Sequence, residues 1–388
     1  MSLIYYDNAA TSWPKPKAVT ERMTQFLNEE AANPGRSGHK MAVDAEKALN
    51  NTRLALTKFI GGTDHSRLIF AMNTTDALNI ALKGFLRAGD HVITTTAEHN
   101  SISRPLQAMA DSKFITLTRV PFNPETGVIN PADIEKALTP KTKLIAMTHA
   151  SNVTGIIQPI EAVGKIAKKH HVKFLVDAAQ TIGIVPLHVN DMHIDLLAFP
   201  GHKSLLGPTG TGGLYVNTTL NPEDLQPFRE GGTGGDSKNP HQPTEFPHLL
   251  EGGTPNTVGI AGLGAALDYV IAHDPAKTLA HERHHVQAII DTLKSDNRFT
   301  LYGPHNADCR VGTISFNIAG QNPADVAAFL ESAFQIAVRQ GLHCAPYAHK
   351  TLGTYPAGTI RISPGHFNTD QDLATLLEAL TAAPENLL

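Results

Sequence analysis

Short apolar runs alternate with longer amphipathic stretches over more than half of this chain, and this alternation is the strongest constraint on its fold. The apolar runs are rich in Val, Ile and Leu and lie at residues 67–71, 91–95, 114–120, 143–148, 173–177, 194–199 and 213–216. Helical patterns separate the early runs, at residues 77–86, 102–110, 131–138 and 160–170. Strands that alternate with helices predict an α/β fold with a mainly parallel sheet covered on both faces.

A segment rich in Gly, Pro, Asn and Thr interrupts this pattern at residues 229–255, and a different order of predicted helices and strands follows it. After a helical stretch at 258–272, strands are predicted at 312–317 and 359–363, with a helix at 324–333 between them. We interpret this part as a smaller α+β domain that the N-terminal segment joins. The predicted division is residues 20–260 for the large domain, and residues 1–19 with 261–388 for the small one.

Composition narrows the function classes. The chain has 388 residues and a formal net charge of −4, so nothing in its charge favours binding to nucleic acid or to a membrane surface. No apolar run approaches the roughly 18 residues of a spanning helix, and the N-terminal residues lack the pattern of a secretory signal. Two cysteines, Cys309 and Cys344, cannot form a disulfide framework. We therefore expect a cytoplasmic protein.

Polar residues follow two strands that are expected to be neighbours. Asp177 ends the apolar run at 173–177, and Lys203 follows the next strand within GHKSLLGPTGTGG. Taken singly, Asp177 could cap a turn and Lys203 could be a solvated loop lysine. Together, at the edge of a parallel sheet where ligands bind, they match the needs of pyridoxal phosphate. The lysine forms a Schiff base with this cofactor, and the carboxylate keeps its pyridine nitrogen protonated.

A phosphate site is expected at Thr74 and Thr75. These two residues follow a strand and open a predicted helix, within MNTTDALN. Backbone N–H groups and the helix dipole favour an anion at such a position, and the two hydroxyls add donors.

Eight short segments, taken together in their order and spacing, narrow the prediction of a pyridoxal-phosphate enzyme to one family. They are YYDNAAT, NTTDALN, AEHN, SNVTG, VDAAQ, GHKSLLGPTGTGGLYV, EGGTPNT and RQGLHCAP. The pattern resembles the class V aminotransferases from Tyr6 to about Thr369, and within them the cysteine desulfurases, nearest the group that includes selenocysteine lyases. This resemblance implies the fold type I architecture of pyridoxal-phosphate enzymes.

The resemblance also implies roles for individual residues. Lys203 would carry the cofactor, Asp177 would pair with the pyridine nitrogen, and His99 would stack on the ring and relay protons. The full cofactor-binding set would be Thr74, Thr75, His99, Asn152, Asp177, Gln180, His202, Lys203 and Thr254. Thr254 would reach the phosphate of a second subunit, which implies a homodimer. Pro200 departs from the family pattern, because many relatives have a Ser or Thr donor two or three residues before the lysine.

Substrate contacts are implied at Asn8, Arg361 and Arg339, with Arg361 as the clamp on the carboxylate of L-cysteine, because a planar guanidinium holds a carboxylate bidentately. Cys344 matches the cysteine that accepts sulfur as a persulfide, which a further acceptor protein would then take. Its neighbours His343 and Arg339 would favour the thiolate. Cys309 matches no motif, and we interpret it as structural.

Other functions fit parts of the pattern. A selenocysteine lyase, or another class V enzyme in which Cys344 is incidental, would use the same cofactor residues. A non-catalytic scaffold for sulfur transfer would not need them intact. The segment HERHH at 281–285 matches a zinc-peptidase motif. We expect His281 and His285 to lie on a solvated helix face, and we expect no metal.

Overall fold

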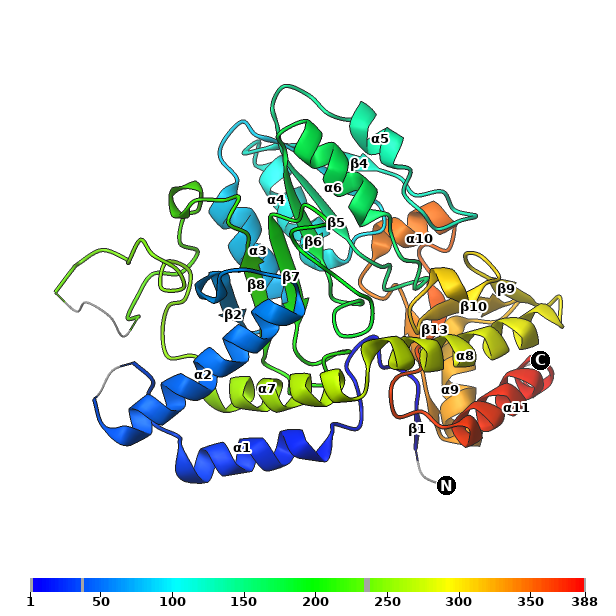
Figure 1. The fold of residues 1–388 in the computed structure, drawn as a ribbon. Helices are drawn as coiled ribbons and strands as arrows, with labels where there is room; N and C mark the ends of the chain where they lie inside the picture. Colours follow the sequence, from blue (N-terminus) through cyan, green and yellow to red (C-terminus); the bar gives the residue numbers. More distant parts are fainter. Residues whose placement is uncertain (1–2, 36–37, 234–237, 387–388) are drawn as a thin grey trace.

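The computed structural model describes residues 3–35, 38–233 and 238–386, and its larger part is built on a seven-stranded sheet (Figure 1). The strand order is β2-β8-β7-β6-β5-β3-β4. The strands are β2 (Leu68–Ala71), β3 (His91–Thr95), β4 (Thr116–Val120), β5 (Thr142–Thr148), β6 (Lys173–Asp177), β7 (Leu196–Pro200) and β8 (Gly212–Val216). β8 runs against its two neighbours, and the other six strands share one direction. The predicted mainly parallel sheet is confirmed.

Helices cover both faces of this sheet because successive strand residues point to opposite faces and both sets are apolar. In β6, Phe174 and Val176 pack into one core, whereas Leu175 packs into the other. The helices α3 (Thr74–Phe85) and α4 (Asn100–Asp111) cover the Leu175 face. The opposite face is covered by α2 (Lys40–Phe59), α5 (Pro131–Lys136), α6 (Ile160–Lys169) and α7 (Thr257–Ala272), with α1 (Lys17–Glu29) packed on α7.

The smaller part has a four-stranded antiparallel sheet in the order β12-β13-β10-β9. Its strands are β9 (Phe299–Leu301), β10 (Ile314–Ile318), β12 (Arg339–Gly341) and β13 (Thr359–Ile362), and its helices are α8 (Pro275–Lys294), α9 (Pro323–Phe334), α10 (Pro346–Leu352) and α11 (Asp370–Asn386). The N-terminal strand β1 (Ile4–Tyr5) pairs in parallel with β11 (Ile336–Ala337), and Tyr6 is buried in the apolar core of this part.

The predicted domain boundary at 260/261 falls inside α7. Leu263 and Leu267 of this helix belong to the core of the large part, together with Ile260. The first residues of α8 follow within a short turn, and Val286 and Ile290 of α8 lie in the core of the small part. The division of the chain at this boundary stays a prediction.

Several element boundaries differ from the predicted ones because polar residues begin or end the elements. The helix α3 begins at Thr74 rather than at 77, since the side chain of Asn73 accepts a hydrogen bond from the Asp76 N–H (3.0 Å) and caps the helix. The strand β4 begins at Thr116 rather than at 114. Within 229–255, the described residues form no helix or strand, as expected, and residues 234–237 lie outside the description.

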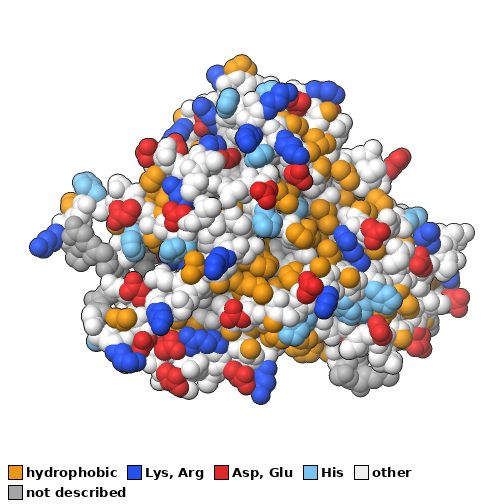
Figure 2. Space-filling view, viewed as in Figure 1, with side chains coloured by type: hydrophobic (Ala, Val, Ile, Leu, Met, Phe, Trp, Pro, Cys, Tyr) orange, Lys and Arg blue, Asp and Glu red, His pale blue; other side chains and the backbone are white. Residues whose placement is uncertain are grey.

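Charged side chains of both signs are interspersed over the face shown in Figure 2. Across the part of the chain that the structure describes, no helix is both long enough and apolar enough to cross a lipid bilayer.

Candidate active site

Lys203 and Asp177 meet at the carboxyl edge of the large sheet. Asp177 is the last residue of β6, it pairs with Ala198 of β7, and Lys203 follows three residues after β7 ends. Burial raises the pKa of Asp177 to about 6, and the positive charge of Lys203 opposes this rise. Burial lowers the pKa of Lys203 to about 8, and the negative charge of Asp177 opposes that fall. The two groups are thus close enough to influence each other's protonation.

His99 caps α4 and faces the same region. Its Nδ1 accepts a hydrogen bond from the Ser101 N–H (3.1 Å), so the ring proton is assigned to Nε2. Burial, and then the positive charges of Lys203, Arg339 and Arg361, lower the pKa of His99 to about 3. The ring is therefore neutral near pH 7 and can donate a hydrogen bond from Nε2.

Ser101 joins His99 to the first turn of α3, a link that the sequence analysis missed. The Ser101 hydroxyl lies 2.7 Å from His99 Nδ1 and 2.7 Å from the Thr75 hydroxyl. Thr74 is buried at the start of the same helix. The N-termini of α3 and α4 thus meet at this point, with hydroxyl groups between them. The only sequence signal was that Ser101 follows AEHN, where an N-terminal helical hydroxyl is common.

His202 and Gln180 tie the Lys203 loop to the N-terminal segment. His202 Nδ1 lies 3.1 Å from the Thr11 hydroxyl, and the His202 carbonyl accepts a hydrogen bond from Lys15 Nζ (2.8 Å). Burial, and then the charge of Lys203, lower the pKa of His202 to about 4, so this ring is also neutral near pH 7. Gln180 Nε2 donates a hydrogen bond to the Ala9 carbonyl (3.2 Å).

Arg361 lies in the middle of β13 and is 1% exposed. Its Nη1 donates to the Asn152 carbonyl (3.1 Å), and its Nη2 donates to Asp7 Oδ1 (2.5 Å). Two buried polar atoms here, Arg361 Nε and Asn152 Oδ1, have no hydrogen-bond partner among the described residues. Buried polar atoms without partners are uncommon, so they mark a place where a polar ligand fits. Asp7 was missed by the sequence analysis, although it stands inside the YYDNAAT segment.

Asn8 has a structural set of contacts. Its Nδ2 donates hydrogen bonds to the Ser363 carbonyl (3.0 Å) and to Asn368 Oδ1 (3.2 Å), and its Oδ1 accepts one from the Trp13 N–H (3.2 Å). The expected contact of Asn8 with substrate stays a prediction.

Cys344 is partly exposed and shares a pocket of about 790 Å³ with His99 and Thr75. Arg339 Nη2 lies 3.5 Å from its sulfur atom. The backbone at Cys344 is left-handed, with φ 58°, and its carbonyl accepts a hydrogen bond from the Asn100 N–H (2.7 Å). The structure therefore brings the predicted nucleophile next to the start of α4 and to one cation.

The expectation that His343 supplies a second cation beside Cys344 is wrong. The His343 ring is buried, and its Nε2 lies 3.0 Å from the Thr359 hydroxyl in β13. Burial, and then the positive charge of Arg361, lower the pKa of His343 to about 2, so the ring is neutral. Arg339 is the cation that contacts the thiol.

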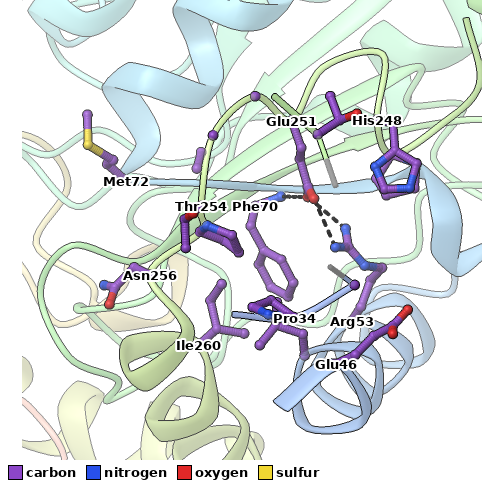
Figure 3. A pocket seen from close by; sticks show the side chains of 18 of the residues that line it. Pro34, Glu46, Arg53, Phe70, Met72, His248, Glu251, Thr254, Asn256 and Ile260 are labelled. Carbon is purple, nitrogen blue, oxygen red and sulfur yellow. Dashed lines mark hydrogen bonds and ion pairs between the residues drawn. The ribbon is translucent and has the colours of Figure 1, made fainter. Parts of the chain in front are cut away.

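Lys203 is not among the residues that line the pocket in which Thr254 lies. Thr254 is exposed and lines this pocket, of about 570 Å³, together with Met72 (Figure 3). In that pocket Arg53 forms an ion pair with Glu251 (2.8 Å), and Glu251 also accepts a hydrogen bond from the Phe70 N–H (2.6 Å).

His281 and His285 of the HERHH segment do not lie on the solvated helix face that we had expected. His285 is 0% exposed, and its Nδ1 lies 3.4 Å from the Tyr6 hydroxyl. Glu282 is also buried and accepts a hydrogen bond from the Gly312 N–H (3.1 Å). His281 is partly buried and contacts the Asn368 carbonyl (2.8 Å). Besides its apolar face, α8 has a second buried side, which packs against the chain near Gly312 and Asn368. The spacing of apolar residues in the sequence does not reveal this side, because the contacts there are polar.

No cluster of metal-ligating side chains occurs among the described residues. Cys309, which we interpreted as structural, is partly exposed, and its thiol donates to the Asn306 carbonyl (3.1 Å).

The fold and the site define an α/β enzyme that pairs a lysine with a buried carboxylate at the sheet edge and places a cysteine in the pocket that His99 lines. The chain belongs to the aminotransferase class-V family, whose model matches residues 4–376. It is 36% identical over 382 residues to a probable cysteine desulfurase of Methanothermobacter thermautotrophicus, covering 97% of this chain and 94% of that protein. It is 35% identical to a cysteine desulfurase of Escherichia coli, covering 98% of this chain and 93% of that protein.

Solved structures agree with these relatives. The apo structure of a cysteine desulfurase from Thermococcus onnurineus superposes with a TM-score of 0.91 at 34% identity, covering 99% of this chain and 94% of that one. A cysteine desulfurase from Escherichia coli, in its S-sulfonic acid form, superposes with a TM-score of 0.88 at 28% identity, covering 100% of this chain and 96% of that one. The predicted fold type I architecture is confirmed. The alternatives of a selenocysteine lyase, another class V enzyme and a zinc peptidase are not favoured by these matches.

Proposed function

We propose that this protein is a pyridoxal-phosphate-dependent cysteine desulfurase that moves sulfur from L-cysteine onto Cys344. The observation that supports this most directly is that Cys344 and His99 line one pocket, while Lys203 and the positive charges of Arg339 and Arg361 act on the same His99 ring. The relatives named cysteine desulfurases support the same assignment of substrate and reaction.

The residues present fit pyridoxal phosphate. Lys203 would hold the aldehyde carbon of the cofactor, because its lowered pKa of about 8 leaves an appreciable fraction of neutral amine near neutral pH. Asp177 would accept a hydrogen bond from the pyridine N–H and so keep this nitrogen protonated. Thr74, Thr75 and the N-terminus of α3 would hold the phosphate, with His202 nearby. When bound, the cofactor supplies an electron sink for the substrate carbon.

The chain's own residues would orient the substrate and move its protons. Arg361 would bind the carboxylate of L-cysteine through the Nε–H that has no partner among the described residues. Asn152 Oδ1, which no described residue contacts by a hydrogen bond, would accept one from the substrate or from the cofactor. Neutral His99 would donate from Nε2, and Lys203, once released from the cofactor, would carry the proton taken from the substrate carbon.

The sulfur transfer is a displacement at sulfur. The Cys344 thiolate, stabilised by Arg339, forms a new S–S bond with the substrate sulfur while the substrate's C–S bond breaks. The electron pair of that bond stays with carbon, which takes up a proton, and the carbon skeleton leaves as alanine. The persulfide remains on Cys344 until an acceptor protein takes the outer sulfur.

We also propose a homodimer in the cytoplasm, with Thr254 contacting the phosphate site of the second subunit. Its support is the exposure of Thr254 beside Met72, which is 57% exposed although apolar. Apolar side chains such as Phe70 and Ile260 also line the pocket that Thr254 and Met72 share, and apolar surface of this kind is a common feature of subunit contacts.

The test of the proposed function is the pair of variants Cys344→Ala and Cys309→Ala. Cys344→Ala should still bind pyridoxal phosphate and L-cysteine, because Lys203, Asp177 and Arg361 remain, and it should release almost no sulfide. The measurement is sulfide and alanine after incubation with L-cysteine and a reductant. Cys309→Ala is the matched control and should keep wild-type rates. Wild-type sulfide release by Cys344→Ala, or a trapped persulfide on Cys309, would exclude the proposed reaction.

A further inference from the structure

We assigned the substrate carboxylate to Arg361. In the structure, Asp7 already contacts one nitrogen of this guanidinium, Nη2. The ion pair between Arg361 Nη2 and Asp7 Oδ1 is 2.5 Å long, and the two side chains are 1% and 22% exposed. We propose that Asp7 is a specificity-determining residue that holds the place of the substrate carboxylate on Arg361, so that an amino acid has to displace it to bind. This inference rests on the proposed role of Arg361.

The geometry of the guanidinium carries the argument. Nε–H and one Nη2–H point in the same direction and form the edge that a carboxylate grips with two parallel hydrogen bonds. Asp7 takes the Nη2 end with a single oxygen, and the Nε end is buried without a partner among the described residues. Nη1 is held separately by the Asn152 carbonyl (3.1 Å). A substrate carboxylate that binds both ends of this edge needs Nη2 as well as Nε, and it therefore competes with Asp7 Oδ1 for Nη2.

The charges around Asp7 come from several elements. Arg361 on β13, Arg339 on β12 and Lys203 after β7 are the cations of the site, and the Tyr5 hydroxyl of β1 donates to the Asp7 carbonyl (3.2 Å). The negative charge of Asp7 acts on both Lys203 and Arg361. Removing this charge leaves the positive charges of Lys203 and Arg361 less balanced, and such a site attracts an incoming carboxylate more strongly.

The backbone at Asp7 is held without help from its side chain. The Ser363 N–H donates to the Tyr6 carbonyl (2.7 Å), the Asn8 N–H donates to the Ser363 carbonyl (3.2 Å), and the Ala9 N–H donates to the Ser363 hydroxyl (3.0 Å). The carboxylate can therefore leave Arg361 by side-chain rotation while the N-terminal segment stays paired with β13. Displacement is a local event.

The test is the affinity of the enzyme for L-alanine, an amino acid that has the carboxylate and lacks the sulfur. The holoenzyme is titrated with L-alanine, and binding is followed by the cofactor absorbance and by the unfolding temperature. Asp7→Asn should bind L-alanine about tenfold more tightly than wild type, since a neutral amide competes less well for a buried guanidinium. Asp7→Glu, which keeps the charge, should stay close to wild type. Asp133→Asn, an exposed carboxylate paired with Lys136, is the control and should change nothing.

Unliganded Asp7→Asn should unfold at a lower temperature than wild type, and L-alanine should raise its unfolding temperature by more than it raises that of wild type. Should Asp7→Asn fail to fold, Asp7→Ser is measured in the same way. Equal or weaker L-alanine binding by the folded variant overturns the inference.

The variant Arg361→Gln distinguishes a failure of the role proposed for Asp7 from a failure of the role proposed for Arg361. If it binds L-alanine as well as wild type does, Arg361 is not the carboxylate site and the proposed role of Arg361 fails. If it loses binding while Asp7→Asn gains none, only the role of Asp7 fails.

Discussion

Lys203 and Asp177 show how one pair of side chains can be prepared for cofactor chemistry. Burial disfavours the charged form of each group, which raises the pKa of Asp177 and lowers that of Lys203. The opposite charge of the partner stabilises each charged form and so reduces both shifts. The lysine consequently has a pKa of about 8 instead of the ordinary 10.5. Only its neutral amine attacks an aldehyde, so this shift would control how the proposed cofactor is loaded.

The pH dependence of cofactor loading tests how burial and the charge of Asp177 together set the pKa of Lys203. In cofactor-free protein, the rate of covalent attachment of pyridoxal phosphate to Lys203 should rise with pH through a midpoint of about 8. Asp177→Asn removes the charge that raises the pKa of Lys203, so its midpoint should lie lower than that of wild type. Borohydride trapping and mass spectrometry measure the labelled fraction at each pH. Asp195→Asn, a buried carboxyl at the start of β7, is the control. An unchanged or raised midpoint in Asp177→Asn would contradict this account.

Residues that follow parallel strands could be placed from the sequence, and residues brought in by tertiary contacts could not. Asp177, Lys203 and Thr74 follow strand ends, so the direction of the sheet was enough to predict that they meet at one edge. Asp7 reaches Arg361 across 354 positions of sequence, through pairing of the N-terminal segment with the chain after β13. His285 was placed wrongly because α8 is covered on two sides.

At the scale of an element, the first turn of α3 depends on one side chain. Asn73 accepts a hydrogen bond from the Asp76 N–H and so fixes where the helix begins, three residues before its apolar pattern does. The predicted strands and helices were found to within a few residues, because apolar periodicity reports packing. The polar first turn contains Thr74 and Thr75, which apolar periodicity does not report, and this is the turn that we assign to the phosphate.

Asn73→Ala should lower the free energy of unfolding by about 1 kcal/mol, as the loss of a helix N-cap usually does. It should also weaken the binding of pyridoxal phosphate, since the N–H groups of the first turn would no longer be held in place. Equilibrium dialysis and chemical unfolding measure the two effects. Asn130→Ala removes the corresponding cap of α5 (Asn130 Oδ1 to the Ala132 N–H, 3.1 Å), away from the site. It should cost similar stability and leave cofactor affinity unchanged, and a matching loss of affinity in this control would refute the assignment.

At the scale of the whole molecule, the position of Thr254 argues for composite sites. A mixture of Lys203→Ala and Thr254→Ala subunits forms heterodimers in which one site carries both lesions and the other carries none. Cysteine desulfuration by the mixture should therefore exceed that of either variant alone. The subunits are unfolded and refolded together, and activity is compared with each variant treated in the same way. No gain over Thr254→Ala alone would show that the threonine acts within its own chain or not at all.

The backbone of Cys344 is fixed in place, and this limits how sulfur can leave. Its carbonyl is bonded to the N–H of Asn100, and its neighbours His343 and Ala345 are 2% and 0% exposed. With its backbone held in this way, Cys344 moves its sulfur atom mainly by side-chain rotation. In the proposed reaction, an acceptor would therefore have to present its own thiol on a protruding segment that enters the pocket beside α4. Delivery would then be limited by the docking of that segment, and it would depend on acceptor concentration even when L-cysteine is saturating.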